Sequence, residues 1–353
     1  MTEKTLNTPA LCVDEEILIN NMETMKALLQ GTSLRLRPHY KSHKCAAIAK
    51  KQMEYGAIGM TCSKMCELED LVEIGIEDIL VANQIVDRSK IARLAYLACD
   101  CRITVCVDSE ENIRDLSEAA VMAGSTIHCL VEYDIGMERC GVVNNGDVLR
   151  LAKCITRAPS LEFEGLQAYA GHISHVVDME ERRSMTRANY QKLKVLIAYL
   201  EDNGVKVNIV SGGSTGTAEI KAAEGLYTEL QAGSYIFMDS TYRELGLPFK
   251  NSLYIAATVV SAREGLAVVD AGVKTCGVDQ GMPAVDGFDA LEIVASEEHF
   301  QLHRPSVSLK AGDQVRLIPG HCCSTVNLHD KLYLVRNGKI VNRFNITARG
   351  IGR

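Results

Sequence analysis

Strand-like and helix-like segments alternate through the first two thirds of this chain, and this rhythm constrains the fold more than any other feature. The runs typical of strands lie at 33–41, 57–64, 78–84, 101–108, 126–136, 161–171, 205–213 and 226–239. Helical segments separate them, such as 109–125, which opens on Ser109, a favourable N-cap residue. Eight strands alternating with helices over about 210 residues predict a (β/α)8 TIM barrel. A doubly wound open sheet is the alternative, because a count of strands does not prove closure.

The pattern differs at the two ends of the chain. An amphipathic helix is expected over 14–31, where it stops at a glycine. From about residue 250 onward, strand-like segments follow one another without helices between them. We therefore expect a separate C-terminal antiparallel β domain of about 100 residues.

Composition excludes several classes of protein. The chain has 353 residues with a net charge of −7, which argues against a partner that is nucleic acid or an anionic membrane. No apolar run approaches the roughly 20 residues of a membrane span, and the N-terminus lacks the apolar core of a secretion signal. The 13 cysteines are scattered through apolar stretches, so we expect reduced thiols in a cytoplasmic protein.

The segment LRLRPHYKSHK, residues 34–44, is unusually basic. Its alternation has period two, so apolar and polar side chains fall on opposite faces of a strand. In a barrel the apolar face packs outward against helices, and the polar face points inward. The inward set is then Arg35, Arg37, His39 and Lys41. Lys41 would lie at the C-terminal mouth, where barrel enzymes keep their chemistry, whereas Lys44 has the opposite parity. A solvated edge strand is the alternative interpretation.

Other unusual residues fall at the same rim of the predicted barrel. They are Gln84, Arg139, Tyr169, His172, His175, Gly233, Ser234 and the turn SGGSTGT at 211–217. Small, glycine-rich segments after strands seven and eight are where barrels often bind a phosphate group. A lysine at the mouth together with a phosphate cradle indicates pyridoxal phosphate held as a Schiff base.

A second constellation lies in IPGHCCSTVNLHD, residues 318–330. His321 and Cys323 are two positions apart, so in an extended chain they would project from one face. An imidazole and a thiolate suit Zn²⁺ and tolerate other soft or borderline divalent ions. Zn²⁺ is therefore expected, with Mn²⁺ or Mg²⁺ as alternatives. A buried cysteine beside a hydrogen-bonded histidine is the commoner explanation of such a pair taken alone.

Five ordered motifs together resemble the D-threonine aldolase/D-serine dehydratase group of fold-type III pyridoxal-phosphate enzymes. They are RPHYKSHK, DIGMERCGV, SGGSTGT, YTELQAGSYIFMD and PGHCCSTVNLHD. The match covers nearly the whole chain. The resemblance implies an alanine-racemase-like barrel over residues 14–245, with residues 1–13 and 246–353 forming the β domain that carries the metal ligands. It also implies a homodimer.

The resemblance extends to individual positions. Lys41 matches the Schiff-base lysine, Arg139 the arginine near the phenolic oxygen of the cofactor, and Tyr169 the residue beside the pyridine nitrogen. Further cofactor contacts are implied at Gln84, Thr215, Gly233, Ser234 and Tyr242. His321 and Cys323 match the metal positions and, with Lys41, form the implied catalytic set.

The reaction follows from the same resemblance. Dehydratase members resemble His-x-Cys at the metal, as here, whereas aldolase members resemble His-x-Asp. We therefore expect a metal-dependent carbon–oxygen lyase that converts D-serine, D-threonine or D-threo-3-hydroxyaspartate into a 2-oxo acid and ammonia. The alternative is an aldolase, a carbon–carbon lyase that releases glycine and an aldehyde. A racemase is a minor alternative, because the sequence identifies no second base opposite Lys41. Ala170 stands where many hydroxyaspartate-acting members have histidine, which leaves the β-substituent open.

Overall fold

The computed structural model describes residues 2–350 and divides the chain into two compact units. We call residues 26–41 and 49–233 the barrel unit, and residues 2–25, 42–48 and 234–350 the β unit. The predicted domain limits at residues 14 and 245 remain a prediction. Among the described helices, none combines the length and the apolar character needed to cross a membrane.

The barrel unit is built on eight parallel strands. They are β2 (Arg35–Leu36), β3 (Met60–Cys62), β4 (Asp78–Val81), β5 (Arg102–Val107), β6 (Ile127–Glu132), β7 (Leu161–Gln167), β8 (Ile209–Gly212) and β9 (Glu229–Leu230). Their order in the sheet is β2-β9-β8-β7-β6-β5-β4-β3. The two ends of the sheet meet where His39, just beyond β2, pairs in parallel with Thr61 of β3. The sheet therefore closes, and the predicted barrel is confirmed.

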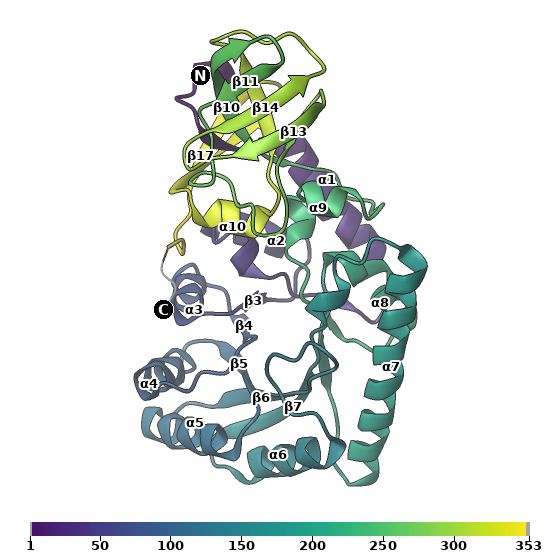
Figure 1. The fold of residues 1–353 in the computed structure, drawn as a ribbon. Helices are drawn as coiled ribbons and strands as arrows, with labels where there is room; N and C mark the ends of the chain where they lie inside the picture. Colours follow the sequence, from purple (N-terminus) through teal and green to yellow (C-terminus); the bar gives the residue numbers. More distant parts are fainter. Residues whose placement is uncertain (1, 351–353) are drawn as a thin grey trace. The chain divides into compact units, whose positions relative to one another are not determined.

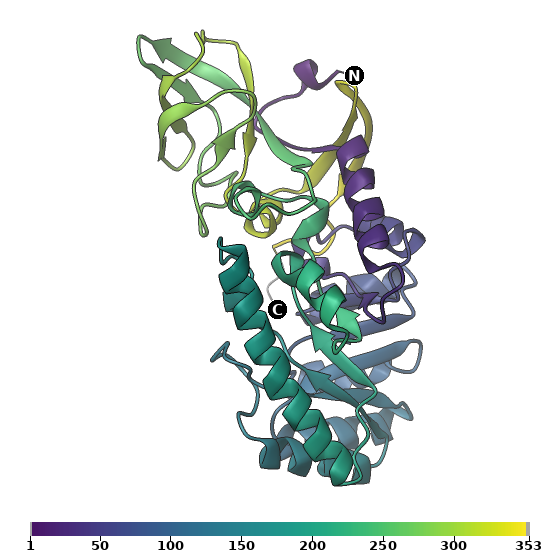
Figure 2. The ribbon, with the colours of Figure 1, turned by 90° about the vertical axis from the view of Figure 1, so that its right-hand side faces the viewer.

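Helices cover the outer face of this barrel, and α3 to α6 can be followed beside strands β3 to β7 in Figure 1. In the barrel unit lie α3 (Met65–Glu73), α4 (Arg88–Leu97), α5 (Glu110–Ala123), α6 (Asn145–Arg157), α7 (Met179–Asp202) and α8 (Ala218–Glu224), whereas α1 (Glu15–Leu29) and α2 (Ala46–Glu54) are divided between the two units. Several begin where the sequence offers a capping side chain. Ser109 accepts a hydrogen bond from the amide of Asn112, as its position predicts. Figure 2 shows the long helix α7 in teal along the barrel unit.

The basic segment at 34–44 is less regular than the predicted strand over 33–41. Only Arg35 and Leu36 form β2, and residues 40–42 form a short 3₁₀ turn, Tyr40–Ser42. Pro38 lies between them and has no N–H group to donate to a neighbouring strand. The chain nevertheless stays extended there, because the amides of Arg37 and His39 donate to carbonyls of residues 230 and 232.

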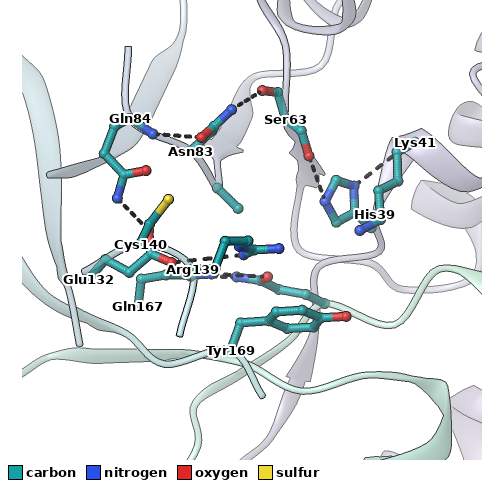
Figure 3. A pocket seen from close by; sticks show the side chains of 12 residues that line it. His39, Lys41, Ser63, Asn83, Gln84, Glu132, Arg139, Cys140, Gln167 and Tyr169 are labelled. Atoms are coloured by element: carbon teal, nitrogen blue, oxygen red, sulfur yellow. Dashed lines mark hydrogen bonds and ion pairs between the residues drawn. The ribbon is translucent and has the colours of Figure 1, made fainter. Parts of the chain in front are cut away.

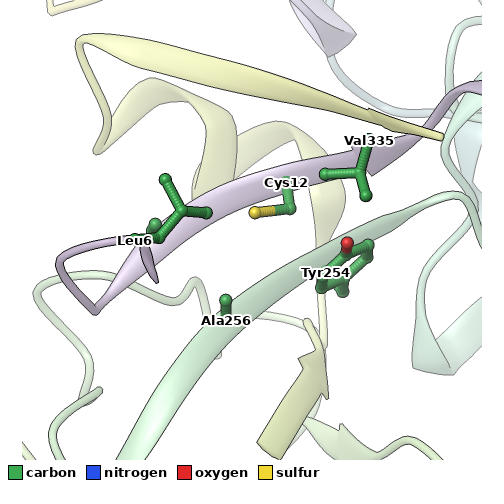
Figure 4. Close-up of a cluster of buried hydrophobic side chains, with 6 residues drawn as sticks. Leu6, Cys12, Tyr254, Ala256 and Val335 are labelled. Atoms are coloured by element: carbon green, nitrogen blue, oxygen red, sulfur yellow. The ribbon is translucent and has the colours of Figure 1, made fainter. Parts of the chain in front are cut away.

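The β unit is a sheet of nine strands. They are β1 (Ala10–Asp14), β10 (Leu253–Arg263), β11 (Leu266–Val269), β12 (Ala284–Val285), β13 (Ala290–Ala295), β14 (Phe300–Pro305), β15 (Gln314–Ile318), β16 (Lys331–Arg336) and β17 (Lys339–Asn345). The N-terminal strand β1 pairs antiparallel with β10 and parallel with β16. Figure 4 shows a cluster of buried side chains on these strands, including Cys12, Tyr254 and Val335.

Two short helices belong to the β unit, α9 (Ser240–Arg243) and α10 (Cys322–Asn327). The expectation of strands alone beyond residue 250 is therefore wrong at α10. The amide of Cys322 donates to the buried carboxylate of Asp239, 3.0 Å away, and the hydroxyl of Thr325 donates to the carbonyl of His321. These side-chain bonds give the first turn of α10 partners that the sequence pattern does not reveal.

Candidate active site

A cavity of about 210 Å³ opens at the carboxyl ends of the barrel strands. The residues that line it follow β2, β3, β4, β6, β7 and β9, so widely separated parts of the sequence meet there (Figure 3). Four predicted site residues are among them, namely Lys41, Gln84, Arg139 and Tyr169. Active sites of such barrels lie at this end, because the loops that follow the strands are free to vary there.

Two cationic side chains approach the ring of Tyr169. The Lys41 Nζ atom lies 5.8 Å from the ring centre, and the Arg139 guanidinium carbon lies 5.4 Å from it. Attraction between a cation and an aromatic face is worth about 0.5–2 kcal/mol, depending on solvent exposure. Tyr169 therefore helps to hold the lysine and the arginine at the cavity.

His39 shapes the turn that carries Lys41. Its Nδ1 atom accepts a hydrogen bond from the amide of Lys41 at 3.4 Å, and its Nε2 atom lies 3.1 Å from the Ser63 hydroxyl. Because Nδ1 accepts, the neutral ring carries its proton on Nε2 and donates it to Ser63. The period-two pattern placed His39 inside the barrel but gave it no role.

Glu132, at the end of β6, places a carboxylate in the cavity. The sequence pattern did not single out this residue. Gln84 donates a hydrogen bond to Glu132 at 2.5 Å, and an Arg139 nitrogen lies 3.9 Å from the other carboxylate oxygen. Burial raises the pKa of Glu132, although the Gln84 hydrogen bond and the Arg139 charge act in the opposite direction. Glu132 thus orients two predicted cofactor contacts at once.

The turn after β8 has the properties of an anion cradle. The buried Thr215 hydroxyl has no hydrogen-bond partner among the described residues. Gly213 has a φ of +80°, a conformation that favours glycine, and a side chain at Gly216 would collide with the carbonyl of Ser174. Gly233 is buried beyond β9. An unpaired hydroxyl beside glycines that leave the backbone accessible could bind a phosphate group. These residues are therefore compatible with pyridoxal phosphate.

The predicted metal ligands lie together in the β unit. His321 is the N-cap of α10, and Cys323 follows in its first turn, so the pair is not on an extended chain as expected. Their side chains are nevertheless hydrogen-bonded to each other. The Cys323 sulfur lies 3.5 Å from the Ser42 hydroxyl and 3.9 Å from the Ser234 hydroxyl. An imidazole nitrogen and a thiol converging in this way match the donors that zinc prefers.

Tyr242, another predicted cofactor contact, is buried in α9 of the same unit. Its amide donates to Asp239 at 3.1 Å, and the other oxygen of that carboxylate accepts from Cys322. Asp239 therefore joins α9 to α10. Asp239 ends the motif YTELQAGSYIFMD, but the motif does not reveal the bond to Cys322, which lies 83 residues further along the chain.

Another cluster of potential metal ligands comprises His128, Glu162 and Glu164, on β6 and β7 of the barrel unit. Arg102 donates to Glu164 at 2.6 Å and lies 3.0 Å from the His128 ring. The positive charge of Arg102 already neutralises this cluster, so we interpret the cluster as structural and not as a metal site.

The fold and the cavity define the class of protein. A model of the alanine racemase N-terminal domain matches residues 13–241, and a model of a putative serine dehydratase domain matches residues 252–335. The chain belongs to this family, the fold-type III pyridoxal-phosphate enzymes. Within the family it falls among the lyases of the D-threonine aldolase/D-serine dehydratase group.

Individual relatives support that placement. The chain is 39% identical to a D-threonine aldolase of Arthrobacter sp., over 99% of this chain and 94% of the relative. It superposes on the crystal structure of a D-threonine aldolase from Filomicrobium marinum with a TM-score of 0.95 and 38% identity, over 99% of this chain and 98% of the other. For the D-threo-3-hydroxyaspartate dehydratase of Delftia sp., the TM-score is 0.87 and the identity 25%, over 98% of both chains. A variant of a D-threo-3-hydroxyaspartate dehydratase with one cysteine replaced by alanine is described in a metal-free form.

Proposed function

We propose that this protein is an aldolase that cleaves β-hydroxy D-amino acids to glycine and an aldehyde, with pyridoxal phosphate and a divalent metal ion. The supporting observation is the 39% identity to a D-threonine aldolase over 99% of the chain. Identity to the Delftia dehydratase is lower, at 25%. This comparison favours the aldolase alternative over the dehydratase that the His-x-Cys pattern placed first.

Pyridoxal phosphate, when bound, supplies an electron sink for negative charge at the α-carbon of the substrate. In the proposal Lys41 holds the cofactor covalently, Arg139 and Gln84 contact its ring, and the Thr215 hydroxyl contacts its phosphate. Gly233, Ser234 and Tyr242 complete the proposed cofactor contacts. When its amine is not bound to the cofactor, Lys41 would give a proton to the α-carbon after the carbon–carbon bond breaks, and this proton completes glycine. The hydrogen bond from the Lys41 amide to His39 keeps that lysine on its turn.

His321 and Cys323 would hold the metal ion, which would lower the pKa of the β-hydroxyl group of the substrate. Zinc is the proposed ion, because a thiolate donor suits zinc better than it suits magnesium or manganese. The hydroxyls of Ser42 and Ser234 lie close enough to Cys323 to hydrogen-bond its sulfur and moderate its charge.

Dehydration is the second candidate, and Cys323 is the observation that favours it. Cleavage of the carbon–carbon bond requires the β-oxygen to lose its proton and remain on the aldehyde. Elimination requires the same oxygen to leave with its bonding electrons. A carboxylate ligand would offer a hard donor and a proton acceptor, whereas the thiol of Cys323 offers a softer, strongly donating one.

One assay separates the candidates. The protein, loaded with pyridoxal phosphate and zinc, is incubated with D-threonine, D-serine and D-threo-3-hydroxyaspartate, and the L-enantiomers serve as controls. Aldehyde and glycine in equal amounts are expected from D-threonine. A 2-oxo acid and ammonia as main products would replace the aldolase with the dehydratase, and the opposite enantiomer alone would favour a racemase. A homodimer, implied by the resemblance, is checked by sedimentation equilibrium.

A further inference from the structure

Asp279 makes two hydrogen bonds to the part of the β unit that carries the candidate metal ligands. One carboxylate oxygen lies 2.7 Å from the Nδ1 atom of His321. The other accepts a hydrogen bond from the Ser324 hydroxyl at 2.5 Å. Both partners belong to the N-terminal end of α10, so the carboxylate spans the turn on which His321 and Cys323 lie.

The segment that carries Asp279 is itself tightly placed. The amide of Gly277 donates to the Thr325 hydroxyl at 2.9 Å, and this hydroxyl in turn donates to the carbonyl of His321. A side chain at Gly277 would collide with Ser324. The backbone near Asp279 is therefore docked on α10, and its carboxylate reaches His321 from a fixed position.

The hydrogen bond assigns the two ring nitrogens of His321. Because the carboxylate accepts from Nδ1–H, the neutral ring keeps its lone pair on Nε2. Nε2 is then the ring nitrogen left available to another partner, and the side chain of Cys323 is among the hydrogen-bond partners of His321. A carboxylate on one nitrogen and a metal on the other is a common arrangement, in which the carboxylate fixes the tautomer and makes the ring a stronger donor.

We propose that Asp279 is a positioning residue that presents His321 to the metal through Nε2, with Ser324 holding Asp279 in place. This inference rests on the metal site of the proposed function. The competing explanation is an ordinary surface ion pair, since 54% of the Asp279 side chain is exposed. Such a pair would contribute little to any measured property. The second hydrogen bond from Ser324 and the docked segment around Gly277 favour the positioning role.

The test measures metal binding directly. Wild type and Asp279→Asn are stripped with a chelator, and Co²⁺ affinity is measured by competition with a chromogenic chelator. We expect Asp279→Asn to bind Co²⁺ about 10–100-fold more weakly, the range found for loss of such a partner. The cobalt–thiolate absorption band should survive at saturating Co²⁺, because Cys323 and Nε2 remain. Ser324→Ala should fall between the two proteins.

Asp289→Asn, a change in another loop of the β unit, is the matched control and should bind Co²⁺ like wild type. Equal affinity of Asp279→Asn and wild type overturns the inference and leaves the proposed function standing. Loss of the thiolate band at saturating Co²⁺ also overturns it, since Asp279 would then be needed as a ligand itself. Failure of wild type to show the band would overturn the metal site of the proposed function, whatever Asp279 does.

Discussion

Two arginines of the barrel unit each face a glutamate, but one pair is close and buried whereas the other is loose and partly exposed. At the amino ends of the strands, Arg37 lies 2.7 Å from Glu229 and 2.8 Å from Asp78, and only 4% of its side chain is exposed. At the carboxyl ends, Arg139 lies 3.9 Å from Glu132, and 47% of its side chain is exposed. We refer to these as the floor pair and the mouth pair.

The difference shows which charges serve the fold and which serve a ligand. The floor arginine directs both of its terminal nitrogens at two carboxylates, so these nitrogens have little capacity left for a further partner. The mouth arginine is in loose contact with its glutamate and lies beside a cavity of about 210 Å³. A loosely paired cation at a cavity is suited to an anionic ligand, whereas a buried cation held by two carboxylates is suited to holding strands together.

The largest expected effect is at the mouth. Lys41→Ala should abolish the absorption of covalently bound pyridoxal phosphate and all turnover, while the melting temperature of the protein without cofactor changes little. Lys44→Ala is the control and should keep the absorption. Loss of the band in the Lys44 variant alone would mean that the opposite lysine carries the cofactor.

At the floor pair we expect a loss of stability instead of a loss of cofactor binding. Arg37→Met should lower the free energy of unfolding by about 3–5 kcal/mol, because Glu229 would be left buried without its partner. Urea unfolding measures this change. Adding Glu229→Gln to Arg37→Met should restore part of the loss. If Arg37→Met unfolds like wild type, the floor pair has no structural role and the contrast with the mouth fails.

Cys323, at the candidate metal site, is expected to influence which products the enzyme releases. Cys323→Asp should lower the ratio of 2-oxo acid to aldehyde by about tenfold, which corresponds to ~1.4 kcal/mol between the two barriers. The aspartate carboxylate is a harder ligand and can accept the proton of the β-hydroxyl group. It therefore favours cleavage, in which the β-oxygen stays on the aldehyde. Products are quantified together with metal content, so that loss of the ion is recognised. A ratio that rises would contradict the role assigned to the sulfur.

The last change concerns Lys221, a buried cation with no carboxylate within ion-pair distance among the described residues. Burial lowers its pKa to about 7, although its Nζ atom lies 3.3 Å from the centre of the Tyr227 ring, which stabilises the charge. The folded protein therefore releases this proton more readily than the unfolded chain. The cost of burying the charge is complete below pH 7 and declines as the pH rises towards 10.

Lys221→Met keeps the apolar stem and removes the charge. It should raise the free energy of unfolding, and by more at pH 6 than at pH 9, because the folded protein loses the buried charge as the pH rises. Urea unfolding at the two pH values measures the difference. If the stabilisation by Lys221→Met increased with pH, the lysine would not be the buried, destabilising charge that the structure indicates.

Sequence predicted the barrel because its signal is repeated along the chain, and eight strands separated by helices leave few alternatives. Period-two alternation predicted Lys41 at the cavity, and Lys41 lines it, although on a 3₁₀ turn and not on a strand. The strand itself is shorter than predicted, because Pro38 interrupts the hydrogen bonding. Glu132 and Asp279 could not be recognised, because their roles depend on partners 48 and 42 residues away in the chain. Long-range partners of this kind leave no local pattern.

Asp239 gives the β unit one further property. Its two oxygens receive the amides of Tyr242 and Cys322, and it is completely buried. The path of the backbone at the start of α10 is thus set by an anchor outside the helix, and the side chain at 323 takes no part in it. A different side chain at position 323 would therefore leave this backbone anchor in place. The residue at position 323 can therefore change, and the reaction with it, while the backbone that carries it stays the same.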